Sequence, residues 1–361
     1  MADGAPEVVY RWDLDKTYLQ TEFGTVRGLL QAAVEGAHSK RAVPGVRALL
    51  QGLSQSRAGR VIVVSGSPTW IRGRLEKMFA LHGIRCDRLV LKDFGAALRR
   101  GRLAAIRGQV PYKLLAHLET RLWLQGRGEA AGEICFGDDA EVDALIYCLY
   151  ADVCAGRIGG PRLARVLQAC GAYDDEIAAV LARLPLLGRG DPVRKIFIHL
   201  ETHSPPARFG AYRGRVLPTF NALQIALHLA DCGFCEDGVV LAVAEALVTE
   251  NRLDAEDLAG TLEDAVRRGV CRRAYGAHAA QHLLPRSAAF AAGFDPAFAA
   301  RVAARLQPFS GEAPPAIGDT LPYEQLFAAE QAFHAARKLA LKTAEKIPGL
   351  AAFLAPREDD D

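Results

Sequence analysis

The sequence predicts an α/β protein with an open, Rossmann-like parallel sheet that carries helices on both faces, followed by a mainly helical region. Strand-like runs and helical runs alternate between residues 8 and 206, which is typical of parallel sheets. The run at 60–68 is apolar and β-branched, as expected of a strand buried on both faces. After residue 206 only helical spacing remains. We therefore expect an α/β unit over 1–205 and a helical accessory region over 206–361.

Each element is predicted from the spacing of its apolar residues and from the turn residues that bound it. Residues 156–192 are expected to form a helical insertion outside the sheet. The expected strands lie at 8–12, within 60–68, within 86–94, at the start of 132–153 and at 194–200. The expected helices lie at 25–38, 46–53, 69–82, 109–126, the end of 132–153, 163–184, 217–231, 238–249, 254–268, 297–306 and 323–346.

Composition and charge narrow the classes of function. Of the 361 residues, 50% are hydrophobic and 24% are charged, which is typical of a globular protein. The 44 basic and 42 acidic residues leave a net charge of +2, so no nucleic-acid partner is predicted. No run reaches the roughly 18 apolar residues of a membrane span, and the first residues lack the features of a signal peptide. The eight cysteines are irregularly spaced, so we expect reduced thiols in a cytoplasmic protein.

Polar side chains follow the expected strands at the points where those strands end. Asp13, Asp15 and Thr17 follow the first strand, and Ser65 and Gly66 follow the second. The carboxyl ends of parallel strands meet at one edge of a sheet, where ligands collect. These groups are therefore expected to lie close together.

The fourth strand and the helix before it bring further charged groups to the same edge. Lys113 lies near the start of the expected helix at 109–126. Asp138 and Asp139 follow the fourth strand, and Asp143 comes four residues after Asp139. Carboxylates gathered at an apolar edge repel one another, so a cation is expected between them.

These residue types suit phosphoryl transfer with Mg²⁺ as the cofactor. Mg²⁺ favours a few carboxylates together with waters and a phosphate oxygen, so Asp13, Asp15 and Asp138 are candidate ligands. A carboxylate such as Asp13 can attack phosphorus and form an aspartyl-phosphate. Asp15 can then act as the general acid and base. Ser65 and Lys113 would hold the phosphoryl oxygens.

Three short motifs, D-x-D-x-T, S-G-S and G-D-D-x-x-x-D, together with a lysine near the start of a helix, resemble the four-motif signature of the haloacid dehalogenase superfamily. The chain has DLDKT (13–17), SGSP (65–68), LKDF (91–94) and GDDAEVDALIY (137–147). The resemblance is closer to one branch, the catalytic domain family of the actin-patch phosphatidate phosphatase. That branch is similar in D-x-D-D-T, S-N-S-P, L-R-D-F and G-D-S-G-E-x-D-P-E-I-Y. The segment VRKIFIHLET also resembles the branch.

The resemblance implies a haloacid dehalogenase fold and a Mg²⁺-dependent phosphatase. It assigns a role to each matching residue. The implied roles are Asp13 as nucleophile, Asp15 as acid and base, Ser65, Gly66 and Lys113 as phosphate binders, and Asp13, Asp15 and Asp138 as Mg²⁺ ligands. Asp143 would orient Lys113 or a metal-bound water, and Thr17 and Asp139 would support the site.

The chain departs from the branch at several positions, and these bear on the substrate. Lys16 replaces an aspartate, Gly66 an asparagine, Asp139 a serine and Ala144 a proline. The lipid-binding regions of the branch have no counterpart here. These departures count against a lipid such as phosphatidate as the substrate, so a phosphorylated small molecule is expected as the alternative to it.

Some assignments stay open in the sequence. Lys92 in LKDF rivals Lys113 as the phosphate-binding lysine. The resemblance favours Lys113, because it opens the helix that leads to the fourth strand, where the superfamily has its lysine. Asp139 is either a metal ligand or a helix N-cap, and the cap is favoured. For the C-x-x-C pair Cys232 and Cys235, a structural role is favoured over metal binding. For His199 and His203, a structural or surface role is favoured over an approach of His203 to the site. For the loop at 210–215, a solvated loop is favoured over contact with an anionic substrate.

The sequence thus predicts a phosphohydrolase that acts on a phosphomonoester through Asp13. The stretches at 18–43 and 93–110 are long enough only for a small cap, which suits a bulky substrate. If the helical region covers the site instead, the substrate would be small. The rival hypothesis is a non-catalytic binding or scaffold protein that uses residues 206–361 as its interaction surface. The intact acidic residues and lysine favour the enzyme.

Overall fold

The computed structural model describes residues 8–14, 17, 43–56, 59–95, 108–129, 132–251, 253–287, 289–290, 293–311 and 319–344. The statements below concern these residues. The predicted helix at 25–38 lies outside them, as do Asp15 and Lys16 of the first motif.

The centre of the protein is a six-stranded parallel sheet in the order β3-β2-β1-β4-β5-β6. The strands are β1 (Val8–Trp12), β2 (Gly59–Pro68), β3 (Arg88–Lys92), β4 (Gly132–Asp138), β5 (Val193–His199) and β6 (Val216–Thr219). The open parallel sheet predicted from the sequence is confirmed. The strand order reverses beside β1, so its carboxyl end lies at the switch point where such sheets bind ligands.

Strand β1 shows why this segment is central. Val8, Tyr10 and Trp12 face one side of the sheet, and Val9 and Arg11 face the other. All of these side chains are buried. A strand covered on both faces cannot alternate apolar and polar residues, which explains its almost continuous apolar run.

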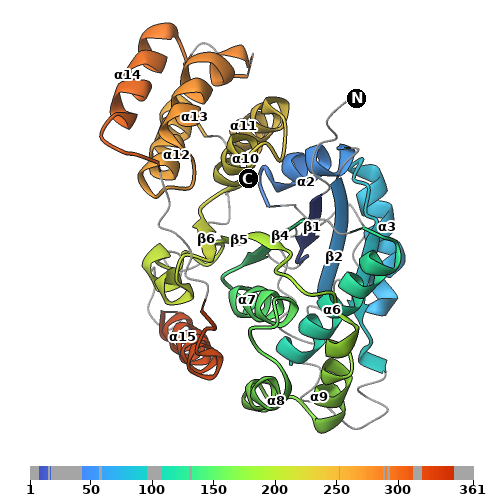
Figure 1. Ribbon diagram of the computed structural model, residues 1–361. Coiled ribbons are helices and arrows are strands. Elements are labelled where there is room, and N and C mark those ends of the chain that lie inside the picture. Colours follow the sequence, from blue (N-terminus) through green and yellow to red (C-terminus); the bar gives the residue numbers. More distant parts are fainter. Residues whose placement is uncertain are drawn as a thin grey trace.

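Helices cover both faces of the sheet, with α2, α10 and α11 on one side and α6 and α7 on the other (Figure 1). The α-helices are α2 (Val46–Gln55), α3 (Arg72–Leu81), α6 (Val110–Gly126), α7 (Asp143–Cys154), α8 (Gly160–Ala169), α9 (Asp174–Leu181), α10 (Ala222–Asp231), α11 (Asp237–Asn251), α12 (Ala255–Arg267), α13 (Arg273–His278), α14 (Pro296–Leu306) and α15 (Tyr323–Ala344). Short helical turns are η1 (Thr69–Ile71), η2 (Leu184–Leu186), η3 (Pro206–Tyr212), η4 (Ala279–Leu283) and η5 (Leu284–Arg286).

The two faces build two main hydrophobic cores. The first joins Tyr10 and Phe136 of the sheet to α2, α3 and the helices α10 to α14. The second joins Cys135 and Ile198 to α6, α7, α8, α9 and α15. Because β4 contributes neighbouring residues to both, the sheet divides the two cores and fixes their relative position.

Strand β5 joins the same parallel sheet as β1, as predicted for 194–200. The insertion before it is helical and lies outside the sheet, also as predicted. The single helix expected at 163–184 is wrong in detail, because α8 ends at Ala169 and α9 begins at Asp174. Gly171, between them, has a φ of 78°, a left-handed conformation that favours glycine.

The sequence predicted no strand after residue 206, and β6 corrects this. Residues 216–219 form the edge strand of the sheet, so the helix expected at 217–231 begins only at Ala222. Pro218 lies within β6, opposite Ile198 of β5. Proline donates no hydrogen bond and is therefore tolerated mainly in edge strands, which made this short strand hard to detect.

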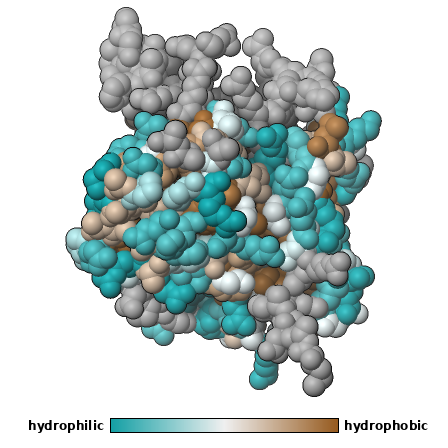
Figure 2. Space-filling model, turned by 90° about the horizontal axis from the view of Figure 1, so that it is seen from above, coloured by the Kyte–Doolittle hydropathy of each residue, from teal (hydrophilic) through white to brown (hydrophobic). Residues whose placement is uncertain are grey.

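The visible face of the described part is a mixture of hydrophilic and hydrophobic side chains (Figure 2). The large exposed apolar residues of the described chain are dispersed, on different elements: Trp70, Leu81, Leu186, Phe220 and Leu339. Among the described residues, no helix combines the length and the apolar character needed to cross a membrane.

Candidate active site

Asp13 lies directly after β1, at the carboxyl edge of the sheet. Its backbone N–H donates to the carbonyl of Phe136 on β4, at 2.9 Å, which holds the residue between two central strands. Its side chain is 1% exposed. Among the described residues, neither carboxylate oxygen of Asp13 accepts a hydrogen bond of good geometry. A buried carboxylate without donors is costly, so this group is suited to bind a cation or to react.

Lys113, in the first turn of α6, is surrounded by carboxylates. Its Nζ lies 2.7 Å from Oδ1 of Asp13, 2.7 Å from Oδ1 of Asp143 and 2.8 Å from Oε2 of Glu141. The contact with Asp13 is an ion pair that lacks the angles of a hydrogen bond, whereas the other two are hydrogen bonds. The sequence therefore placed Lys113 at the correct edge. Glu141 was not predicted, although it lies within the GDDAEVD segment.

Asp138 and Asp143 complete the acidic cluster from β4 and α7. Asp138 ends β4, where its Oδ1 accepts from the N–H of Ala140 at 2.7 Å. Its Oδ2 accepts from Thr17 Oγ1 at 3.1 Å, so Thr17 lies against Asp138. Asp143 begins α7 and reaches back over Gly137, where a Cβ would lie only 2.5 Å from the Cβ of Asp143. A glycine at 137 thus lets Asp143 approach Lys113.

The cluster is suited to a divalent cation. Oxygen atoms of Asp13, Asp138 and Asp143 all lie within 4.8 Å of one another. Neither oxygen of Asp13 accepts a hydrogen bond from the described residues, although Oδ1 pairs with Lys113, and hard carboxylate oxygens are what Mg²⁺ prefers. Asp143 takes the third place in this group; Asp15, the predicted third ligand, lies outside the described residues.

The electrostatics of the cluster follow from burial and crowding. Burial raises the pKa of Asp13 well above its usual range; Lys113 opposes this, and Asp143 and Glu141 add to it. Burial and the same two carboxylates also raise the pKa of Asp138. For Lys113, burial lowers the pKa, but Asp13 and Asp143 outweigh it and raise the pKa well above its usual range. Negative charge therefore exceeds positive charge here, and a bound cation would relieve the repulsion.

The end of β2 meets the start of α6 at the same edge. Ser65 is buried, and its Oγ accepts from the N–H of Ser67 at 2.9 Å. The hydroxyl of Tyr112 donates to the carbonyl of Ser65, at 2.9 Å. A Cβ on Gly66 would lie 2.8 Å from the side-chain amide of Gln109. The predicted phosphate-binding segment thus packs beside the turn that carries Lys113, and Gln109 is a further polar neighbour that the sequence did not indicate.

The structure separates the two candidate lysines. Lys92 ends β3, one strand further from Asp13 than β2. Its Nζ donates to the carbonyl of Gly108 at 2.6 Å and lies 5.2 Å from the ring centre of Tyr112. Burial lowers the pKa of Lys92 to about 8. Lys113, and not Lys92, contacts Asp13.

Asp139 has neither of its two predicted roles, metal ligand or helix N-cap. It belongs to neither the acidic group nor a helix cap, because α7 begins after Val142 without a side-chain cap. Instead, its two oxygens accept from the N–H groups of Thr202 at 2.7 Å and Ser204 at 2.9 Å. Asp139 therefore fixes the loop after β5. The two residues are 63 and 65 positions away in the chain, so sequence spacing could not show this contact.

The remaining candidate residues lie outside the acidic cluster and make contacts that stabilise the fold. His199 ends β5, and its Nε2 lies 3.3 Å from the carbonyl of Phe220. Cys232 and Cys235 take no part in a metal-ligand group within the described residues. All eight cysteines are free thiols. In the loop at 210–215, Arg215 pairs with buried Asp152 at 2.6 Å, so a solvated loop was the wrong expectation for this residue.

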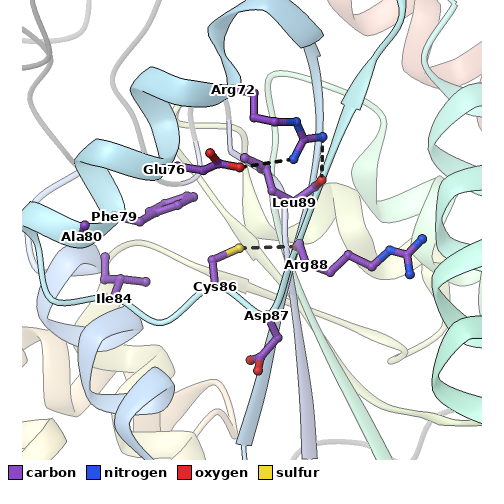
Figure 3. A pocket seen from close by; sticks show the side chains of 9 residues that line it. All are labelled: Arg72, Glu76, Phe79, Ala80, Ile84, Cys86, Asp87, Arg88 and Leu89. Atoms are coloured by element: carbon purple, nitrogen blue, oxygen red, sulfur yellow. Dashed lines mark hydrogen bonds and ion pairs between the residues drawn. The ribbon is translucent and has the colours of Figure 1, made fainter. Parts of the chain in front are cut away.

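A pocket of about 470 Å³ lies elsewhere, between α3 and β3 (Figure 3). Its lining includes Arg72, which pairs with Glu76 and donates to the carbonyl of Leu89. The pocket reaches Cys86 and Arg88, at the amino end of β3. The acidic cluster lies at the carboxyl ends of β1 and β4, so the two sites are distinct.

Comparison of the chain with protein-family models, curated proteins and solved structures found no match.

Proposed function

We propose that this protein is a cytoplasmic, Mg²⁺-dependent phosphohydrolase of the haloacid dehalogenase type, which hydrolyses a phosphomonoester through an aspartyl-phosphate on Asp13. The observation that carries the proposal is the position and environment of the Asp13 carboxylate. Its buried carboxylate lies at the switch point of a parallel sheet, 2.7 Å from Lys113, with both oxygens unused by hydrogen-bond donors of the described residues. A nucleophilic carboxylate needs this combination of fixed position and available lone pairs.

In this mechanism an oxygen of Asp13 attacks phosphorus, and the bond from phosphorus to the leaving oxygen breaks. The leaving oxygen takes a proton from Asp15, according to the resemblance. Water then attacks the phosphorus of the aspartyl-phosphate, Asp15 takes its proton, and inorganic phosphate leaves with the carboxylate of Asp13 restored. Each residue thus returns to its initial state.

Lys113 has the electrostatic role. Its ammonium lies beside Asp13, where the charge of the phosphoryl oxygens must be balanced in the transition state. Asp143 positions Lys113 through a 2.7 Å hydrogen bond, and Thr17 positions Asp138. Asp13 and Asp138, with Asp143 or Asp15, would hold Mg²⁺, which when bound supplies positive charge beside the phosphoryl group.

The substrate class is a phosphomonoester, either of a small molecule or of a lipid such as phosphatidate. The dispersed apolar residues of the described surface offer no specific support for a lipid. A panel of phosphorylated metabolites and phospholipids would distinguish these classes.

The test is hydrolysis of an aryl phosphate by the purified protein with Mg²⁺. We expect turnover by the wild type and background rates for Asp13→Asn, because the amide has the same size but cannot attack phosphorus. Asp231→Asn is the control, since Asp231 lies on α10 and pairs with Arg272 away from the site. Beryllium trifluoride, an analogue of an aspartyl-phosphate, should bind the wild type with Mg²⁺ and not Asp13→Asn.

The rival function is a binding or scaffold protein on the same fold. It predicts no turnover of any phosphomonoester and no binding of beryllium trifluoride by the wild type. Wild-type rates in Asp13→Asn would reject the proposed mechanism.

A further inference from the structure

Glu141 has a position that the proposed catalytic set does not explain. It lies in the turn between β4 and α7. Its Oε2 accepts from Lys113 Nζ at 2.8 Å, and its Oε1 accepts from Gln109 Nε2 at 3.3 Å. Two donors from the start of α6 therefore hold one carboxylate through both of its oxygens. Proteins hold anionic ligands in the same way.

Lys113 has no open position for a substrate in this arrangement. Its Nζ donates to Glu141 and Asp143, and Oδ1 of Asp13 lies 2.7 Å away in an ion pair, so three carboxylate oxygens crowd the ammonium. A phosphoryl oxygen can therefore contact Lys113 only if one carboxylate leaves.

Burial indicates which carboxylate leaves. The side chains of Asp13 and Asp143 are each 1% exposed, whereas that of Glu141 is 26% exposed. Asp143 is also held by the N–H of Asp138, at 3.3 Å, and by close packing on Gly137. Glu141 alone of the three has a path to water.

We propose that Glu141 occupies the phosphoryl subsite of the resting protein and that the phosphate group of the substrate displaces it. Lys113 Nζ and Gln109 Nε2 then become donors to the phosphate. The amide of Gln109 already lies over Gly66, within the segment assigned to phosphate binding. The inference rests on the proposed function. It adds that Glu141 competes with the substrate phosphate and that Gln109 is a second donor to that phosphate.

Competition with Glu141 favours substrates whose phosphate group carries more than one negative charge. A phosphomonoester near neutral pH carries about −1.5 to −2 charges, whereas the carboxylate of Glu141 carries one. A phosphodiester also carries one, so it gains less by displacing Glu141. Dianionic monoesters are therefore the substrate class that this site favours.

The experiment measures the dissociation constant of inorganic phosphate by calorimetry, in the presence of Mg²⁺. Glu141→Gln removes the competing charge, and Glu141→Asp keeps the charge on a side chain one methylene shorter, which cannot reach Lys113 in the same way. We expect both variants to bind phosphate about tenfold more tightly than the wild type. Gln109→Ala should bind about tenfold more weakly.

The matched control is Glu119→Gln, because Glu119 lies on the same helix as Lys113 but pairs with Arg183 at the surface. Its phosphate affinity should equal that of the wild type. Melting temperatures of all variants report whether each one folds.

Three results would overturn the inference. Weaker or unchanged phosphate binding in Glu141→Gln would show that Glu141 serves Lys113 without competing for its place. Wild-type affinity in Glu141→Asp beside tight binding in Glu141→Gln would indicate a general effect of charge. If no variant binds phosphate and the wild type hydrolyses no aryl phosphate, the proposed function itself fails; if the wild type is active, only the role of Glu141 fails.

Discussion

Asp13 combines features that oppose stability in the absence of a metal. Its carboxylate is buried, it lacks hydrogen-bond donors in the described part of the chain, and Asp138, Asp143 and Glu141 surround it. Lys113 compensates only part of this charge, since the net effect on the pKa of Asp13 is upward. Active sites commonly keep such unfavourable groups because the chemistry needs them.

The stability of the metal-free protein should therefore depend on Asp13 and on pH. A carboxyl group with a raised pKa in the folded state binds more protons there than in the unfolded chain, so its contribution to stability falls as pH rises above 3.8. Asp13→Asn cannot ionise. In EDTA we expect this variant to be more stable than the wild type at neutral pH, by about 1–3 kcal/mol, and equally stable near pH 4.

Thermal unfolding between about pH 4 and pH 8 checks this prediction. Millimolar Mg²⁺ should reverse the order, because a ligand that binds the native state raises its stability. A variant that is less stable than the wild type at every pH in EDTA would contradict it.

The central strands are also joined below the site by a buried ion pair. Arg11 of β1 contacts Glu133 of β4 at 2.5 Å, and both side chains are fully buried. Tyr150 of α7 donates to Glu133 at 2.7 Å, and Arg11 donates to Thr120 of α6 at 2.5 Å. This network ties two strands to two helices on the face that carries Lys113, so it helps to define where α6 enters the site.

Removal of one partner of this pair should cost more than removal of both. Arg11→Met leaves Glu133 buried without its main counter-ion, and we expect a loss of about 3–5 kcal/mol in the free energy of unfolding. The double variant Arg11→Met with Glu133→Met should lose less than the single one, because no isolated charge remains. Urea unfolding of the four proteins in this cycle measures the coupling. Additive losses would mean that the pair is not coupled.

The first hydrophobic core contains residues from both sides of the predicted domain boundary at residue 205. Leu50 of α2 and Leu227 of α10 are both fully or almost fully buried in it. Strand β6 also extends the sheet from the region after 206. On the other face, α15 approaches the loop after β5 through Glu330, which pairs with Arg208 and accepts from Tyr212 at 2.8 Å. The helical region is therefore packed into both sides of the α/β unit.

We expect one cooperative unfolding transition, which Leu50→Ala and Leu227→Ala should both shift. Each variant leaves a cavity in the same core and should lose about 2–5 kcal/mol. Calorimetry with the wild type as reference measures the transitions. If the helical region unfolds separately, Leu227→Ala will move one transition and Leu50→Ala another.

The sequence by itself determined the parallel sheet and the edge at which the site lies. Continuous apolar runs report strands that are buried on both faces, and polar residues directly after them report the strand ends. This information is local, so it could be read at Asp13, Ser65 and Asp138 without a structure. The position of Lys113 near a helix start was local information too.

Only the tertiary structure decided which groups meet at that edge. Asp139 holds a loop more than 60 residues away, and Glu141, just before α7, reaches Lys113 because α6 and α7 pack against each other. Strand β6 forms because it pairs with β5. Its four residues include a proline, so the segment alone has too weak a strand pattern to be predicted from the sequence. These contacts depend on how separate elements pack, and the free energy of that packing is not encoded in the spacing of any one segment.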